Sequence, residues 1–253
     1  MMKIYDEVIQ KELDFIWSSA TPSTKAGVTA IPITTISTDP AGYNWPDDGN
    51  NAIIFRSDMA YELGGGTLSA ISSQTLTEDE ELVPKNEILL YGPDLNQISK
   101  DISYARLTFL RVKKESFGEG NALYSAIRKI DYTKYHVHPH GYMSRISAAN
   151  HREPVRVSKT ALSEGLSFEK IGNAYMKAYL EHPQVEAVKI IFITDPAFDY
   201  KALESHCLRA EQITDALDHI LKDFKMDCKA CNLKEVCDEV EGLRELHFSA
   251  AGQ

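Results

Sequence analysis

Three cysteines lie close together near the end of the sequence: Cys228 and Cys231 are separated by two residues, and Cys237 follows them. A Cys-x-x-Cys pair lets two thiolates converge on one ion or one cluster edge, because the intervening turn aims both sulfurs the same way. Disulfide frameworks usually spread their bridges along the chain, so this clustering favours a metal centre in a reducing compartment. Tetrahedral zinc and a cubane iron-sulfur cluster both normally take four protein ligands, so a fourth ligand must be found.

Two residues compete for the fourth ligand position. Cys207 has the right chemistry, but it precedes Cys228 by 21 residues in a predicted helix. At about 1.5 Å of rise per residue an unbroken helix would place it about 30 Å away, so we interpret it as a small buried core residue. His247 follows Cys237 by ten residues, inside the same local segment, and is the predicted fourth ligand. Accidental clustering of inert thiols is the structural alternative to any metal.

The segments that must position this tail alternate between strand and helix. Val188–Thr194 is a nearly continuous β-branched run, typical of a strand buried on both faces of a sheet. Ser167–Leu180 has the apolar spacing of a helix, with Ser167 predicted as its N-cap, and Asp199–Phe224 reads as one long helix. The buried side of the first helix is predicted to carry Phe168, Ile171, Tyr175, Met176 and Tyr179.

The first half of the chain is less regular. A helix is predicted over residues 3–16, ending near Trp17, and residues 18–50 read as loop with a short strand around Ile31–Ile36. Further strands are predicted where short apolar runs meet turn residues, and a helix is predicted over residues 119–133. The predicted strands are Ala52–Phe55, Glu87–Tyr91, Arg106–Val112 and Pro154–Ser158.

This alternation predicts an α/β fold, a layered sheet with covering helices, with a mixed α+β arrangement as the alternative. We expect an N-terminal helix and loop over residues 1–50, an α/β domain over 51–224 and a metal-binding tail over 225–253. Gly64, Gly65 and Gly66 lack the lysine of a phosphate-binding loop, so they are interpreted as a structural turn.

Charge and hydropathy exclude several classes of protein. The 253 residues carry 27 Lys and Arg against 37 Asp and Glu, a net charge of -10, which argues against binding to nucleic acid or to an anionic membrane. No apolar run reaches the roughly 18 to 20 residues of a membrane-spanning helix, and the charged start is unlike a signal peptide. We therefore expect a cytoplasmic protein.

Several segments, in this order, resemble the middle region of acetyl-CoA synthase. That protein is the subunit of the carbon monoxide dehydrogenase/acetyl-CoA synthase complex that assembles acetyl-CoA from CO, a methyl group and coenzyme A. The similarity extends over roughly residues 58 to 240. The matching stretches are Tyr61–Gly65, Ile88–Leu95, Val155–Lys159 and Val188–Asp195.

The resemblance implies an iron-sulfur cluster. In that family the segment after the long helix carries a nickel-iron-sulfur centre, and its cubane is held by four cysteines. Cys228 and Cys231 fall at the matching place, and the ten-residue spacing of the family's last two cysteines is similar to that between Cys237 and His247. The segment between the second and third ligands is shorter here, and the 253 residues lack the Cys-Gly-Cys element that holds the distal nickel. Nickel and autonomous acetyl-CoA synthesis are therefore not expected.

Four basic residues surround the strand that, in the family, lies in the region implicated in coenzyme A binding: Arg145, Arg152, Arg156 and Lys159. The planar fork of arginine suits phosphate, so these residues are the predicted cofactor-binding set, with a solvated basic face as the alternative. The family's tryptophan ahead of this strand is replaced near Pro154. His136, His138 and His140 alternate in sequence, which suggests either a small metal or phosphate site or a polar loop broken by Pro139.

The function expected is that of an acetyl-CoA-synthase-like iron-sulfur protein, an accessory or cluster-carrying component of one-carbon or corrinoid metabolism in an anaerobe, with a protein partner. No catalytic residue is assigned. The alternatives are a CO-methylating acyltransferase, with Cys231 bridging to an added nickel, and a zinc-stabilised interaction module.

Overall fold

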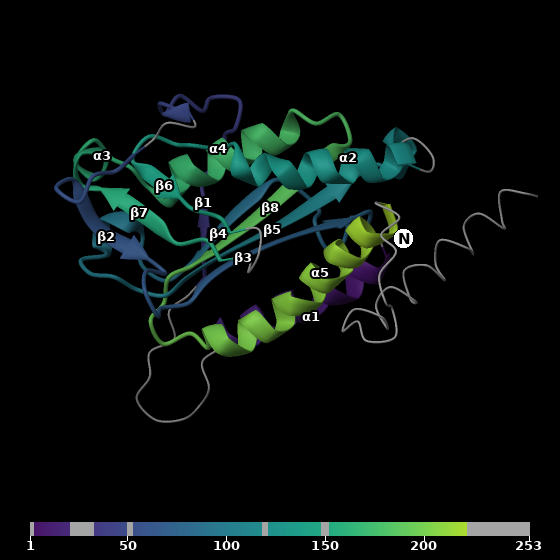
Figure 1. Cartoon of the computed structure of the whole chain (residues 1–253), viewed down its shortest axis with the longest axis horizontal. Coiled ribbons are helices and arrows are strands. Elements are labelled where there is room, and N and C mark those ends of the chain that lie inside the picture. Colours follow the sequence, from purple (N-terminus) through teal and green to yellow (C-terminus); the bar gives the residue numbers. More distant parts are fainter. Residues whose placement is uncertain (1–2, 21–32, 50–52, 118–120, 148–151, 222–253) are drawn as a thin grey trace, which may run out of the picture.

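A computed structural model describes residues 3–20, 33–49, 53–117, 121–147 and 152–221. Within them the chain forms two β-sheets, α-helices and short 3-10 helices (Figure 1). In chain order the elements are α1 (Lys3–Ala20), β1 (Ile33–Ile36), β2 (Met59–Leu63), β3 (Ala70–Thr77), β4 (Glu87–Tyr91), η2 (Leu95–Gln97), β5 (Tyr104–Val112), η3 (Lys114–Ser116), α2 (Asn121–Tyr132), η4 (Thr133–Tyr135), β6 (Tyr142–Ser144), β7 (Val155–Ser158), α3 (Lys159–Ser163), α4 (Phe168–Leu180), β8 (Val185–Ile193) and α5 (Tyr200–Leu221).

The larger sheet has the strand order β1-β4-β8-β5-β3. The pairs β4–β8 and β3–β5 are parallel, whereas β1–β4 and β5–β8 are antiparallel, so the sheet is mixed. The central strand β8 is buried along almost its whole length, as its continuous apolar run predicts. β4 coincides with its predicted range and β5 begins two residues earlier than predicted.

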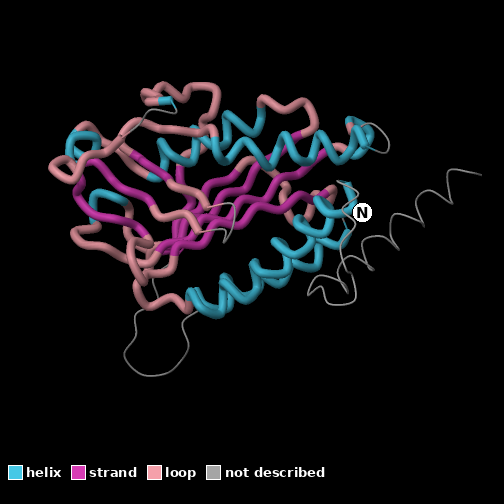
Figure 2. Tube along the Cα trace, in the orientation of Figure 1, coloured by secondary structure: helices cyan, strands magenta, loops and turns pink. Residues whose placement is uncertain are grey.

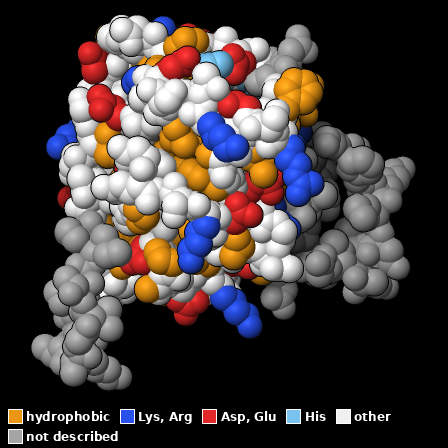
Figure 3. Space-filling view, turned by 90° about the vertical axis from the view of Figure 1, so that its left-hand side faces the viewer, with side chains coloured by type: hydrophobic (Ala, Val, Ile, Leu, Met, Phe, Trp, Pro, Cys, Tyr) orange, Lys and Arg blue, Asp and Glu red, His pale blue; other side chains and the backbone are white. Residues whose placement is uncertain are grey.

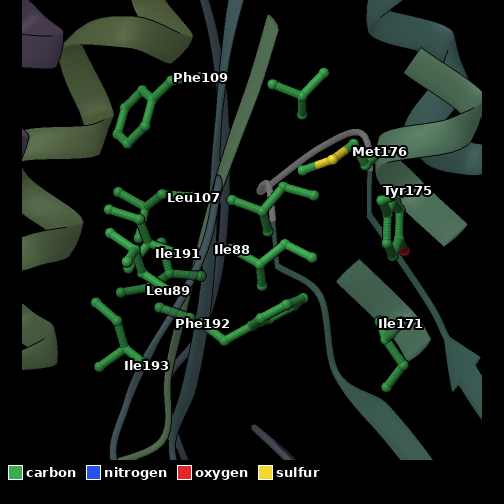
Figure 4. Close-up of a cluster of buried hydrophobic side chains, with 14 of the residues drawn as sticks. Ile88, Leu89, Leu107, Phe109, Ile171, Tyr175, Met176, Ile191, Phe192 and Ile193 are labelled. Carbon is green, nitrogen blue, oxygen red and sulfur yellow. The ribbon is translucent and has the colours of Figure 1, made fainter. Parts of the chain in front are cut away.

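Helices cover both faces of this sheet (Figure 1), with α2 and α4 on one face and α1 and α5 on the other. Figure 4 shows the core on the two sides: Ile88 and Phe192 point toward Ile171 and Tyr175 of α4, while Leu107 and Ile191 point to the opposite face. All five α4 residues predicted to be buried are buried. The layered α/β prediction is therefore confirmed.

The smaller sheet has the order β2-β7-β6 and lies at one end of the larger one (Figure 2). In β2 and β7 the apolar residues Tyr61, Leu63, Val155 and Val157 are buried, while Glu62 and Arg156 between them are more exposed. The hydroxyls of Tyr104, on β5, and Tyr142, on β6, are 2.7 Å apart and join the two sheets.

Some predicted boundaries were wrong. No strand covers Ile53–Phe55, where Ile53 and Phe55 are exposed, and the nearest strand is β2. β2, β3 and β6 were not predicted, because β3 carries serines and threonines and the other two are short. α1 continues to Ala20, beyond the predicted end near Trp17, whereas the described part of the predicted strand Ile31–Ile36 does form β1. Ser167 occupies the N-cap position of α4 but makes no capping hydrogen bond, and the Asp94 carboxylate accepts the Phe168 N–H instead, at 3.0 Å.

The glycine turn is structural, as predicted. Gly64 and Gly66 have φ of 66° and 60°, and a Cβ on Gly64 would come within 2.2 Å of the Ala70 Cβ. The Arg152 guanidinium closes the turn by donating to the carbonyls of Gly64, Gly66 and Leu68. Among the described residues, no helix is both long enough and apolar enough to cross a membrane.

Candidate functional site

The predicted metal ligands Cys228, Cys231, Cys237 and His247 lie outside the described residues. What the structure does show is the helix that precedes them. α5 ends its described part at Leu221, seven residues before Cys228. Its buried side packs on α1 and β3, so the chain enters the tail from a fixed element of the domain.

A row of buried side chains holds α5 against the domain: Leu203, Cys207, Ala210, Ile213 and Ala216. Cys207 has 1% of its surface exposed, as predicted for a core residue. Burial, and then the nearby Glu12 carboxyl, raise the pKa of its thiol well above the ordinary value. Cys207 is therefore neutral and inaccessible within the folded domain, which agrees with its exclusion as a ligand.

Of the four predicted cofactor-binding residues, the structure brings Arg145 and Arg156 to one shared partner, and all four already contact acceptors of this chain. Arg145 and Arg156 both pair with Glu62 Oε1, at 3.2 Å and 2.7 Å. Lys159 Nζ donates to the carbonyl of Ser57 at 3.2 Å. The fourth, Arg152, holds the glycine turn. A phosphate would have to compete with Glu62 for two of the guanidinium groups.

Figure 3 views the end of the molecule that carries this small sheet, and Lys and Arg side chains there are interspersed with Asp and Glu. Exposure is nevertheless enough for a ligand to reach the arginines, since the Arg145 and Arg156 side chains are 42% and 33% exposed. Binding of coenzyme A at this face stays a prediction.

The three alternating histidines do not converge. His140 Nδ1 lies 2.8 Å from Asp48 Oδ1, and its Nε2 lies 3.7 Å from Glu164. His136 instead stacks on Tyr132, at the end of α2. Among the described residues no three His, Cys, Asp or Glu side chains gather in a way that could hold a metal. The reading as a polar loop fits this geometry, because His140 ties the loop to the segment around Asp48.

A buried ion pair that the sequence did not reveal lies where the two sheets meet. Arg106, on β5, contacts Glu153 through Nε and Nη2, both 2.9 Å from Oε2, and the two side chains are 1% and 0% exposed. The same carboxylate accepts hydrogen bonds from Ser144 and Tyr175, at 2.9 Å and 3.3 Å. Arg106 also donates to Thr108 at 3.0 Å. Nearly every polar atom of the pair is thus satisfied, as a buried pair requires.

A second buried group, Glu12 on α1, is not neutralised in this way. It is fully buried, and neither of its carboxyl oxygens has a hydrogen bond of good geometry among the described residues. Its neighbours are the Cys207 thiol, the Ser73 hydroxyl and the Glu211 carboxyl. Burial raises the pKa of Glu12 from 4.5 to about 8, so the group is uncharged at neutral pH.

A comparison with protein families gives a match over much of the described domain. Residues 49–198 match the family of the CO dehydrogenase/acetyl-CoA synthase complex beta subunit, and this span is more than half of the 253 residues. It includes the small sheet, four strands of the large sheet and helices α2 to α4. No curated protein matches the chain. By the extent of this match, the chain belongs to the family of CO dehydrogenase/acetyl-CoA synthase complex beta subunits.

Proposed function

We propose that this family member is an iron-sulfur protein, an accessory or cluster-carrying component of CO and acetyl-CoA metabolism. Its cubane cluster would be held by Cys228, Cys231, Cys237 and His247. The observation that carries the proposal is the position of the Cys-x-x-Cys pair, seven residues beyond the described end of α5, in a chain whose preceding domain belongs to the family.

The donor set fits an iron-sulfur cluster. Thiolates are the usual ligands of such clusters, and imidazole replaces thiolate on iron in some of them. The neutral, buried Cys207 is not available for this purpose, which leaves the tail to supply the thiolates. When bound, a cluster of this kind supplies one-electron transfer, or an iron with an incomplete ligand set.

The folded domain holds α5, the helix that precedes the predicted ligands, in place. α5 packs along α1, and its Thr214 hydroxyl lies 3.1 Å from the Tyr5 hydroxyl near the start of α1. A helix held at this point cannot slide along the sheet without breaking buried contacts, so α5 has a defined place in the domain. This arrangement supports a cluster presented to a protein partner in a one-carbon or corrinoid enzyme system, as the name of the family suggests.

Anaerobic isolation tests the proposal. We expect a brown protein with broad visible absorption and about four iron atoms and four sulfides per chain, as thiolate-held cubanes require. Cys228→Ser and Cys231→Ser should each lose most of the iron. Cys207→Ala is the matched control, since it removes the cysteine that the core encloses, and it should retain the iron. A colourless protein with stoichiometric zinc would overturn the proposal and favour the interaction module.

A second assay separates the accessory role from catalysis. Nickel reconstitution followed by measurement of CO/acetyl-CoA exchange should give no exchange, because the distal nickel element is not among the 253 residues. Exchange that depends on nickel and is lost in Cys231→Ser would instead identify an acyltransferase.

A further inference from the structure

Two large apolar side chains lie exposed, almost adjacent in the sequence, just ahead of β2. Ile53 and Phe55 are 64% and 70% exposed, the highest values among the large hydrophobic residues that the structure describes. Ile54 between them is 6% exposed, so it faces the core while its two neighbours face solvent. Single exposed apolar residues are common on protein surfaces, but neighbouring ones on the same side of a segment indicate contact with another molecule.

The segment that carries these side chains is anchored to the rest of the domain. The Ile54 N–H donates to the Met143 sulfur, on β6, at 3.4 Å. The Phe55 carbonyl accepts the Asp58 N–H at 3.0 Å, which closes a turn ahead of β2. The Lys159 N–H donates to the Asp58 carbonyl at 2.7 Å and joins this turn to the start of α3. A partner that docks here therefore orders little backbone, and the entropic cost of binding is low.

The exposed charge beside this apolar pair is positive. Arg56 is exposed, and its guanidinium makes no hydrogen bond or ion pair with the described residues. Lys159 Nζ lies 3.2 Å from the Ser57 carbonyl, so it adds a second cation to the same turn. The Asp58 carboxylate instead accepts a hydrogen bond from the Ser158 hydroxyl, at the end of β7, at 2.5 Å. Exposed apolar side chains next to an unpaired arginine complement an apolar pocket that has carboxylates at its rim.

We propose that Ile53, Phe55 and Arg56 form a docking surface for a different protein, one that presents an apolar pocket with Asp or Glu at its rim. The family is named as a subunit of a complex, which supports a protein partner. A second copy of this chain fits less well, because a two-fold contact through this turn would bring two Arg56 side chains together. The surface lies at the end of the molecule that carries the small sheet, whereas the described part of α5 ends at the opposite end (Figure 1). The inference therefore does not depend on the iron-sulfur proposal.

Photo-crosslinking of the full chain, in the cells that produce it, identifies the partner. The photoreactive residue p-benzoylphenylalanine replaces Phe55, and the matched control carries it in place of Leu208, which is 51% exposed on α5. We expect a different protein to cross-link from position 55 and not from position 208, through a peptide in which apolar residues adjoin Asp or Glu. Cross-linking only between copies of this chain, equal cross-linking from both positions, or none from position 55 would overturn the proposal.

Isothermal titration of the purified pair then measures the affinity. Phe55→Ala should raise the Kd at least about 30-fold, the loss typical of a central aromatic contact, whereas Leu208→Ala should leave it unchanged. Arg56→Glu should also raise the Kd, and this loss should shrink between about 50 mM and about 500 mM NaCl, because salt screens the repulsion from the acidic rim. All three positions are exposed, so the variants should melt at the wild-type temperature. An unchanged Kd in Phe55→Ala, or an Arg56→Glu loss that does not depend on salt, would contradict the proposal.

Discussion

The replacement Glu12→Gln should make the protein more stable at alkaline pH. Glu12 is fully buried on α1, and its folded-state pKa of about 8 lies above the ordinary value of 4.5. Below pH 4.5 the carboxyl is protonated in both the folded and the unfolded chain. Above that pH the unfolded chain releases the proton while the folded chain keeps it, so the stability falls as the pH rises toward 8.

The magnitude follows from the two pKa values. Each pH unit between them costs about 1.4 kcal/mol for a single group, and the whole interval amounts to about 4 kcal/mol between pH 5 and pH 8.5. Glutamine has nearly the same shape and carries no ionisable proton, so this slope should vanish in the variant. The neighbouring Cys207 and Ser73 give the amide polar contacts.

Urea denaturation of wild type and Glu12→Gln at pH 5 and pH 8.5, in reducing buffer, measures the difference. The free energy of unfolding of the variant minus that of wild type should be about 4 kcal/mol larger at pH 8.5 than at pH 5, so the variant gains stability over wild type at the higher pH. Glu7→Gln, an exposed position on the same helix, is the control and should show almost no such change. Equal pH dependence in wild type and Glu12→Gln would refute the reasoning, because it would mean that Glu12 is ionised and compensated in the folded protein.

Three further predictions concern the body of the domain. Arg106→Met strands the buried charge of Glu153 and should lower the free energy of unfolding by about 3 to 5 kcal/mol in urea denaturation; a loss below 1 kcal/mol would contradict the ion-pair assignment. Glu62→Gln removes the carboxylate that pairs with Arg145 and Arg156, so both guanidinium groups become available to phosphate. Coenzyme A binding, measured by titration, should therefore become tighter. Unchanged or absent binding would contradict a coenzyme A site at this face. Gly64→Ala places a Cβ against Ala70 at a positive φ, so it should lower the melting temperature by several degrees in scanning calorimetry. An unchanged melting temperature would contradict the tight turn.

Hydrophobic pattern predicted the parts of the fold that are buried among apolar neighbours. β8, β4 and β5 are rich in apolar residues because they are buried along most of their length, and α4 shows its buried side at helical spacing. β3 escaped prediction because its buried face is polar: Thr77 donates to Asp6 at 2.6 Å, and Ser73 lies beside Glu12. A polar segment can thus form a buried strand because its side chains contact polar groups far away in the sequence.

The site could be predicted only where the chemistry is local. The Cys-x-x-Cys pair is visible because two ligands stand within four residues of each other. The pairing of Arg106 with Glu153 joins residues 47 positions apart, and only the fold brings them together. For the same reason the sequence suggested free basic residues around β7, whereas Arg156 is paired with Glu62 on the adjacent strand.

Iron and acid-labile sulfide determination on freshly isolated, oxygen-free protein, combined with electron paramagnetic resonance after dithionite reduction, tests the central claim most directly. We predict about four of each atom per chain and a reduced-cluster signal that disappears in Cys228→Ser but persists in Cys207→Ala. Zinc in place of iron, or a signal that survives the loss of Cys228, would contradict the account.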